Sequence, residues 1–237
     1  MHLIKNYLHW LHFKWPVSSV EALPEVNAHG ETNIRGVYVV GDLLGKALLK
    51  FSADSGSRCV TNIVENRRLL NRTIQEDVKD IAIIGGGVSG HAAAAEAAAC
   101  DLSYSLFETN QPFSTIENFP ESKPIYLYPD DMQVQGTINF DSGPNAKEPL
   151  LNYLNTRSAE QSISCSQCTI THFEKRGDIF LLYSVDRQVA KAHRVILAIG
   201  RSGNYRTLDI PGAESKKVPN RLHDPNVYRG RDVLIVG

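Results

Sequence analysis

The chain has 237 residues, of which 42% are apolar and 22% are charged, so it can bury a hydrophobic core and does not have the composition of a disordered chain. Its 25 basic and 26 acidic side chains give a net charge of −1. This balance argues against a nucleic-acid backbone as the main partner, because phosphate binding needs a surplus of basic groups. No stretch approaches the roughly 20 apolar residues of a spanning helix, and we expect a cytoplasmic protein without a membrane span.

The N-terminal third contains a short amphipathic segment, a strand and a helix. Residues 1–16 place apolar side chains on one helical face, and we expect this helix to pack on its own protein; docking to a membrane or another chain is the alternative. After a turn region, residues 36–40 predict an apolar strand that ends at Gly41 and Asp42. A helical stretch then continues to about Arg72.

The strongest motif follows a second apolar strand, residues 80–84. Gly85, Gly87 and Gly90 fit the G-x-G-x-x-G pattern of dinucleotide-binding turns. The first glycine permits the tight turn, the second lets the backbone approach a pyrophosphate, and the third lets the next helix lie close to the sheet. The helix predicted over residues 91–99 is nearly all alanine, which suits close packing.

The residues that follow the glycines predict an anion site and a ribose site. Val88 and Ser89 lie where a helix N-terminus presents unpaired backbone N–H groups to an anion. Residues 102–107 predict the next strand, and Glu108 stands at its end, eighteen residues after the last glycine, where a carboxylate accepts hydrogen bonds from an adenosine ribose. An acidic residue there disfavours a 2′-phosphate, so the motif favours FAD or NAD over NADP; a glycine-rich turn without a ligand is the alternative. We expect the side chain of His91 to pack in the helix face.

Cys165 and Cys168 are the closely spaced pair among the four cysteines. The spacing allows a redox-active dithiol or half of a zinc site, but the flanking polar and β-branched residues predict a strand over about 162–171. Side chains three residues apart in a strand point to opposite faces, so the two thiols could not meet. We therefore favour a structural role for both cysteines and expect no metal.

Four separated motifs resemble the FAD-dependent pyridine nucleotide-disulfide oxidoreductases, the class that includes thioredoxin reductases. The first is the glycine motif with Glu108, and the second is the run RVILAIG at residues 194–200. The second motif is similar to a family strand that ends in Ala-Thr-Gly. Ala198 and Gly200 match that pattern, while Ile199 replaces the threonine, so backbone contact must serve where the family has a hydroxyl.

The third and fourth motifs lie nearer the two ends of the chain. The run GVYVVGD at residues 36–42 is similar to the family's second FAD motif. In that motif the aspartate, here Asp42 after Gly41, holds a ribityl hydroxyl, and the next helix points at the flavin. The run DVLIVG at residues 232–237 looks like the opening strand of the family's NAD(P)H-binding fold, and we expect a strand over residues 231–237.

Within this class, residues 118–126 and 197–212 most resemble thioredoxin reductase-like proteins related to the bacillithiol disulfide reductases. The order of the motifs departs from the family, in which the Gly-Asp motif follows the NAD(P)H domain. We interpret the change as a permutation through a linker at residues 71–79, since the FAD domain is built from both chain ends; the alternative is that residues 1–75 are left over from a different domain. The chain stops one residue into a second glycine motif, so we expect a fragment of a longer protein.

The resemblance implies an α/β fold, namely a Rossmann-like three-layer FAD/NAD(P)-binding domain with a β-meander. It implies that residues 1–75 pack on an FAD-binding domain at 76–215, and that residues 216–237 form a linker and the first strand of a truncated NAD(P)H-binding domain. The implied chemistry is hydride transfer from NAD(P)H to FAD and electron delivery to a small-molecule or protein disulfide or another acceptor, in an enzyme that we expect to be a homodimer. No catalytic residue is identified, and the implied cofactor-binding residues are Gly41, Asp42, Gly85, Gly87, Val88, Ser89, Gly90, Glu108, Ala198 and Gly200.

Two other functions and several further residues stay open at this point. The alternatives are a flavin monooxygenase, which shares the double dinucleotide fold, and a catalytically silent FAD-binding or sensing module. Residues 114–116 are placed to cover the pyrophosphate side of the cofactor. Lys123 is a candidate flavin contact or a solvated loop residue, and Arg201 and Arg206 are candidates for steering a dinucleotide phosphate or for interdomain salt bridges.

Overall fold

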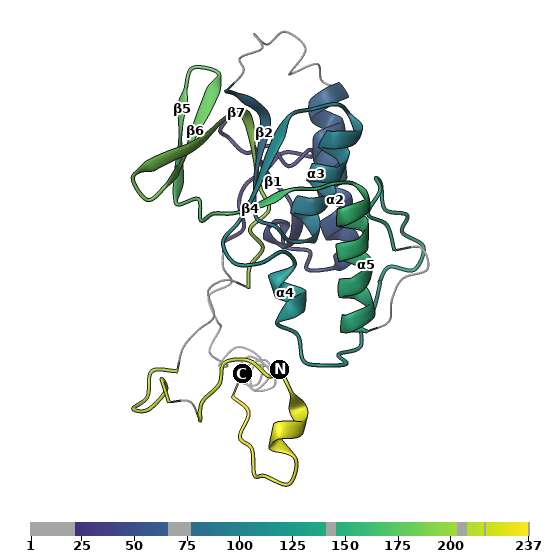
Figure 1. Ribbon diagram of the computed structural model, residues 1–237, viewed down its shortest axis with the longest axis vertical. Coiled ribbons are helices and arrows are strands. Elements are labelled where there is room, and N and C mark those ends of the chain that lie inside the picture. The colour runs from purple at the N-terminus through teal and green to yellow at the C-terminus, as the bar shows by residue number, and fades with distance from the viewer. Residues whose placement is uncertain (1–21, 66–76, 141–145, 203–207, 216, 237) are drawn as a thin grey trace, which may run out of the picture.

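The computed structural model describes residues 22–65, 77–140, 146–202, 208–215 and 217–236 (Figure 1). The expected helix at residues 1–16 and most of the expected linker at 71–79 lie outside these ranges. Within them, no helix is both long enough and apolar enough to cross a bilayer.

A single sheet of parallel and antiparallel strands organises the chain (Figure 1). Its parallel part has the order β4 (Cys165–Gln167), β3 (Tyr104–Glu108), β2 (Lys79–Ile84), β7 (Arg187–Leu197) and β1 (Val37–Val39). Its antiparallel part is the meander of β5 (His172–Arg176), β6 (Ile179–Ser184) and the first half of β7. Strand β7 is eleven residues long and belongs to both parts, since its first half pairs with β6 and its second half with β1.

Strand β2 is buried on both faces, as expected for the centre of a parallel sheet. Successive side chains alternate between the faces. Ile81 and Ile83 therefore join the cluster under the helices, whereas Ala82 and Ile84 join the cluster under the meander. The parallel part of the sheet is covered by helices on one face and by the meander strands β5 and β6 on the other (Figure 1), which confirms the predicted α/β three-layer fold with a β-meander.

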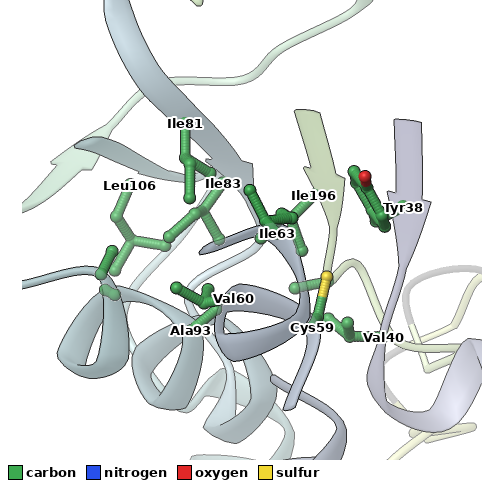
Figure 2. Close-up of a cluster of buried hydrophobic side chains, with 13 residues drawn as sticks. Tyr38, Val40, Cys59, Val60, Ile63, Ile81, Ile83, Ala93, Leu106 and Ile196 are labelled. Carbon is green, nitrogen blue, oxygen red and sulfur yellow. The ribbon is translucent and has the colours of Figure 1, made fainter. Parts of the chain in front are cut away.

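The helical side consists of α2 (Leu49–Glu65), α3 (Val88–Ala99) and α5 (Lys147–Glu160), with the single turn α4 (Ser114–Glu117) between α3 and α5 in the chain. Figure 2 shows Val60 and Ile63 of α2 and Ala93 of α3 against the sheet residues Ile83 and Ile196. The described residues also form two short 3-10 helices, η1 (Gly41–Leu44) and η2 (Pro225–Tyr228).

Helices α2 and α3 pack closely because their contact uses very small residues. A Cβ added to Gly56 of α2 would lie 2.2 Å from the backbone oxygen of Ser89 in α3. Nearly the whole face of α3 in this contact is alanine, with Ala92 and Ala93 fully buried. The close approach brings the first turns of both helices to the same edge of the sheet.

The N-terminal part of the described chain belongs to this same body. Strand β1 pairs in parallel with the end of β7, and the backbone N–H of Val40 donates to the oxygen of Leu197 at 3.0 Å. The helical stretch expected after Asp42 consists of η1 and α2, separated by Gly45 in a left-handed conformation. Its expected continuation to Arg72 lies outside the described residues.

Two strand predictions are wrong in whole or in part. Residues 232–236 form no strand, and Leu234 is 88% exposed, because a strand needs a neighbour that pairs with its backbone and no strand of the described chain pairs with this segment. The strand expected over about 162–171 is limited to β4, which pairs with the end of β3 through only three residue pairs.

Candidate functional site

A cavity of about 440 Å³ opens at the carboxyl ends of the parallel strands, where β2, β3 and β7 stop. Strand ends meet there because parallel strands point the same way, and ligands of open α/β sheets bind at this edge. The predicted site residues that line the cavity are Asp42, Gly85, Gly87, Val88, Ser89, Glu108, Ala198 and Gly200. The other two predicted residues, Gly41 and Gly90, do not line it.

The three motif glycines have three different surroundings. Gly85 has φ +111°, and a Cβ there would lie 2.4 Å from the oxygen of Ala198. A Cβ on Gly90 would lie 1.9 Å from the oxygen of Gly85, so the turn and the first turn of α3 touch. Gly87, in contrast, has no atom within 4 Å of an added Cβ and faces open space. Two glycines are thus needed by the fold, and the middle one leaves room for a ligand.

The first turn of α3 is free to bind an anion. Gly87 is the N-cap residue and supplies no side-chain hydrogen bond to the helix. The first N–H groups of a helix have no partner within it, and the helix dipole places partial positive charge there. Among the described residues, no lysine, arginine or histidine lines this cavity.

Glu108 is held in place beside the glycine-rich turn. One carboxylate oxygen accepts a hydrogen bond from the N–H of Gly86 at 2.7 Å, and the other accepts from the N–H of Asn110 at 3.1 Å. A carboxylate has about four acceptor positions, so two stay available for hydroxyl groups. A carboxylate with two free acceptor positions can accept hydrogen bonds from the two hydroxyl groups of a diol, and its negative charge repels an anionic group.

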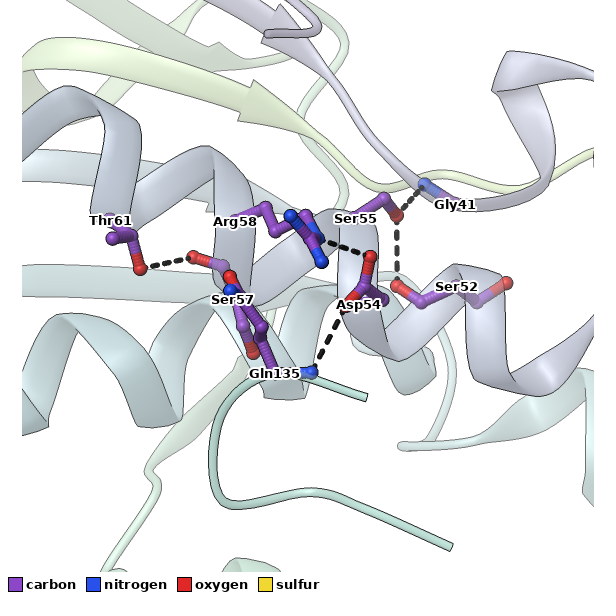
Figure 3. Close-up of polar contacts among 8 residues, drawn as sticks. All are labelled: Gly41, Ser52, Asp54, Ser55, Ser57, Arg58, Thr61 and Gln135. Atoms are coloured by element: carbon purple, nitrogen blue, oxygen red, sulfur yellow. Dashed lines mark hydrogen bonds and ion pairs between the residues drawn. The ribbon is translucent and has the colours of Figure 1, made fainter. Parts of the chain in front are cut away.

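Asp42 reaches the cavity from η1 and is oriented by α2. Its Oδ1 accepts a hydrogen bond from the hydroxyl of Ser52 at 2.9 Å. The neighbouring turn is held as well, since the N–H of Gly41 donates to the Oγ of Ser55 at 2.9 Å and that hydroxyl donates to the oxygen of Ser52 (Figure 3). Sequence reasoning missed both serines, although their i, i+3 spacing in the first turns of the helix could have indicated them.

Gly41 also explains how two motifs far apart in the chain come together. It has φ +74°, and an added Cβ would lie 2.5 Å from the Oγ of Ser89. The end of β1 therefore lies directly on the first turn of α3. Gly41 itself lines a second cavity of about 710 Å³ on the other side of this turn, over the outer face of α2.

The other candidate residues are divided between the cavity and its surroundings. Residues 114–116 line the cavity, and the hydroxyl of Thr115 lies 2.8 Å from that of Ser202, which lines it as well. Lys123 does not line the cavity; its ammonium group lies 3.8 Å over the ring of Phe119, which does. Arg201 is exposed, and Arg206 lies outside the described residues.

His91 packs inside the helix face, as predicted, and is only 1% exposed. Its ring lies against the ring of Phe113, with the centroids 4.2 Å apart. Phe113, which also lines the cavity, has a left-handed backbone with φ 57°. A left-handed phenylalanine has no signal in the sequence, so this wall could not be predicted.

The two neighbouring cysteines lie on opposite faces of the sheet, as the strand argument predicted. Cys165 packs against the cluster under the helices and Cys168 against the cluster under the meander, and neither forms a disulfide. Burial and the nearby Glu108 raise the pKa of the Cys165 thiol to about 11, so it is protonated at neutral pH. The part of the chain that the structure describes holds no cluster of potential metal ligands.

The comparisons with known proteins agree with the fold. A family model described as pyridine nucleotide-disulphide oxidoreductase matches residues 82–237, well over half of the chain. No curated protein matches the sequence.

Among solved structures, a bacillithiol disulfide reductase from Staphylococcus aureus matches with a TM-score of 0.55 at 20% identity, over 64% of this chain and 47% of that one. A flavin-containing monooxygenase from Stenotrophomonas maltophilia matches with a TM-score of 0.48 at 22% identity, over 56% and 42% of the two chains. A thioredoxin reductase from Streptococcus pyogenes matches with a TM-score of 0.42 at 24% identity, over 58% and 40%. The chain thus spans about half of the length of these structures or less, and the likeness to the first is one of fold. By the family model that it matches, the chain belongs to the pyridine nucleotide-disulfide oxidoreductases.

Proposed function

We propose that this chain binds FAD in the cavity at the carboxyl edge of the sheet and forms the flavin-binding part of an NAD(P)H-dependent oxidoreductase. One observation carries the proposal: the uncapped first turn of α3 and the open space at Gly87 face the same cavity as the anchored carboxylate of Glu108. A dinucleotide has a diphosphate for the first feature and a ribose diol for the second. The apolar walls, which include Phe107, Phe113 and Ile199, suit its aromatic rings.

The diphosphate would be held by backbone N–H groups at the start of α3. Val88 and Ser89 present the N–H groups of the first turn of α3, and Gly87 leaves space for the phosphate oxygens. A helix N-terminus stabilises an anion by about 0.3–1 kcal/mol at an exposed site and by up to about 2 kcal/mol when partly buried. With no cationic side chain among the described residues that line the cavity, a ligand with a third phosphate would lack a partner for its charge.

The two acidic residues would hold the two sugar-like parts of the cofactor. Glu108 would accept the hydroxyl groups of the adenosine ribose, and its negative charge would disfavour a 2′-phosphate. Asp42, oriented by Ser52, would accept a hydroxyl of the ribityl chain. Leu48 and Leu49 line the cavity at the start of α2. The first turn of that helix contains no acidic residue. No carboxylate of that turn would therefore neutralise the positive end of the helix dipole, which would face the flavin ring.

Bound FAD would supply the hydride and electron transfer, while the protein positions the cofactor. We propose that NAD(P)H is the hydride donor and that a disulfide or another acceptor takes the electrons, in line with the family to which the chain belongs. The pair Cys165 and Cys168 is unsuited to be that disulfide. Its thiols lie on opposite faces of the sheet, and the protonated thiol of Cys165 is a poor nucleophile.

The topology supports the interpretation that the motifs are permuted. Strand β1 pairs with β7 beside β2, so the Gly-Asp turn and the glycine-rich turn share one sheet edge, and Asp42 and Ala198 line one cavity. An unrelated leftover domain would have no reason to complete this sheet. The order of the motifs along the chain then changes the loops without changing the site.

The proposal is tested by FAD binding to the purified protein and to three variants. Wild-type protein should retain flavin after desalting, and Glu108→Ala should weaken the FAD dissociation constant about 10- to 100-fold, since each charged hydrogen bond contributes roughly 1.5–3 kcal/mol. Glu174→Ala removes an exposed carboxylate of the meander, whose ion pair is to Arg176, and should leave the constant unchanged. Asp42→Ala should weaken FAD binding as well if the N-terminal segment completes the site. Wild-type protein that takes up no flavin would refute the proposal.

A further inference from the structure

His91 is a buried titratable residue that does not line the proposed binding site. It follows the last glycine of the motif directly and lies in the first turns of α3, almost completely buried. A buried imidazole must satisfy its polar nitrogens, and its partners show what it holds in place. Those partners are parts of the glycine-rich turn itself.

The imidazole fixes the carbonyl group of Gly87. Its Nδ1 lies 3.1 Å from the oxygen of Gly87, and the backbone N–H of His91 donates to the same oxygen at 3.0 Å. A carbonyl oxygen can only accept, so Nδ1 carries the hydrogen and donates. Both acceptor positions of the Gly87 oxygen are then used, which fixes the plane of the peptide between Gly87 and Val88.

The orientation of this peptide decides where its N–H group points. In a trans peptide, the C=O and N–H groups point in opposite directions. Because His91 holds the Gly87 oxygen toward the helix, the N–H of Val88 points away from the helix, toward the cavity that Val88 lines. This N–H group belongs to the uncapped first turn, where the proposed function places the phosphate.

The second face of the ring supports the neighbouring peptide. The His91 ring packs against Phe113, whose backbone N–H donates to the oxygen of Gly86 at 2.9 Å. His91 therefore holds the carbonyl group of Gly87, and Phe113, against which its ring packs, holds the carbonyl group of Gly86. Burial lowers the pKa of His91 below its ordinary value of 6.5, against the opposing effects of the Gly87 and Gly86 carbonyls and of Glu108, so the ring is neutral at pH 7.

We propose that His91 is a positioning residue for the dinucleotide diphosphate: its Nδ1–H holds the Gly87 carbonyl and thereby aims the Val88 N–H at the phosphate. This inference rests on the proposed function of the cavity. It adds that the affinity for the diphosphate depends on a side chain that never touches it. The polarity of the ring, and not only its volume, is what the turn requires.

The test compares His91→Leu with His91→Asn. Leucine fills the space without a donor, whereas the Asn side-chain nitrogen takes the place of Nδ1. We expect His91→Leu to weaken binding of FAD and of ADP about tenfold, and His91→Asn to bind both within about threefold of wild type. Melting of the apo-protein should change little in either variant, because the backbone N–H of His91 still satisfies the Gly87 oxygen.

Adenosine, which lacks the diphosphate, is the internal control. Its binding, measured by ligand-observed NMR, should be the same in wild type and His91→Leu, whereas a general collapse of the cavity would weaken adenosine as well and would overturn the inference. Equal FAD affinity in wild type and His91→Leu would also overturn it. If His91→Leu does not fold, His91→Gln takes its place in the comparison, because the Gln amide lies one bond farther from the backbone than Nδ1 of histidine. Equal FAD binding by His91→Gln and His91→Asn would then refute the positioning role. Failure of the wild type to bind FAD would instead refute the proposed function itself.

Discussion

The substitution Gly87→Ala tests the role of the glycine motif in binding separately from its role in folding. Gly87 has φ −79° and ψ −169°, which any residue can adopt, and an added Cβ would meet nothing within 4 Å. Replacing glycine by alanine lowers the conformational entropy of the unfolded chain, which stabilises the folded protein by about 0.4–1 kcal/mol. Alanine is a poorer N-cap residue than glycine, which destabilises it by a similar amount. We therefore expect Gly87→Ala to change the free energy of unfolding by less than about 1 kcal/mol.

The same methyl group should strongly affect cofactor binding. It would occupy the space through which a phosphate approaches the N–H groups of Val88 and Ser89. Losing one charged hydrogen bond removes about 1.5–3 kcal/mol, which corresponds to a FAD dissociation constant about 10- to 150-fold weaker. A fluorescence titration of the apo-protein with FAD measures this change.

Gly90→Ala is the matched control, because it adds the same methyl group three residues later. Its Cβ would lie 1.9 Å from the oxygen of Gly85, so α3 must move away from the turn. Overpacking of this kind costs about 1–3 kcal/mol, and each kcal/mol lowers the melting temperature of a chain of this size by about 2–4 °C. Unchanged FAD affinity in Gly87→Ala, or unchanged melting in Gly90→Ala, would refute the roles assigned here to these two glycines.

Three further predictions concern the surroundings of the cavity. Ser52→Ala removes the hydrogen bond that orients Asp42 and should weaken FAD binding about 3- to 10-fold in a calorimetric titration, with unchanged affinity as the contrary result. In a Cys168→Ser background, iodoacetamide should label Cys165 about 100-fold more slowly at pH 7.5 than a thiol of ordinary pKa 9.0. The labelling rate, measured by mass spectrometry, should rise until about pH 11, and rapid labelling at pH 7.5 would contradict a half-buried, protonated thiol. The pKa of His91 is lower in the folded state than in the unfolded chain, so below pH 6.5 the unfolded chain binds a proton that the folded protein does not. The free energy of unfolding should therefore fall as the pH drops below 6.5. Urea unfolding of His91→Asn should show a shallower decrease, and an identical pH profile would contradict a neutral buried ring.

Local sequence patterns were sufficient to predict the glycine-rich turn and the strand before it. The apolar run 80–84 predicts a strand buried on both faces, and β2 has that character. Gly85 and Gly90 show the close contacts that the motif predicts, and Glu108 stands at the end of β3, where its distance from the glycines places it. These features depend on sterics and spacing within one strand-helix-strand unit, so a single sequence contains them.

The terminal run 231–237 shows where local patterns fail. Its apolar residues predict a strand as strongly as those before Gly85 do, yet residues 232–236 are unpaired and exposed in the described chain. The two runs differ in their neighbours: residues 80–84 lie between β3 and β7, whereas none of the described strands pairs with residues 232–236. Hydrophobic periodicity reports the potential to form a strand, whereas pairing requires a second segment.

By itself, the amino-acid sequence determined the glycine-rich turn and the acidic residue after the second strand, because each depends on residues close together in the chain, and it indicated the family through several separate motifs. Only the tertiary structure decided that Asp42 lies in the same cavity as Glu108, that Ser52 orients it, and that His91 holds the Gly87 peptide. These relations depend on which strands pair and how closely α2 approaches α3. Such contacts join residues distant in the chain, and no pattern within a short window contains that information.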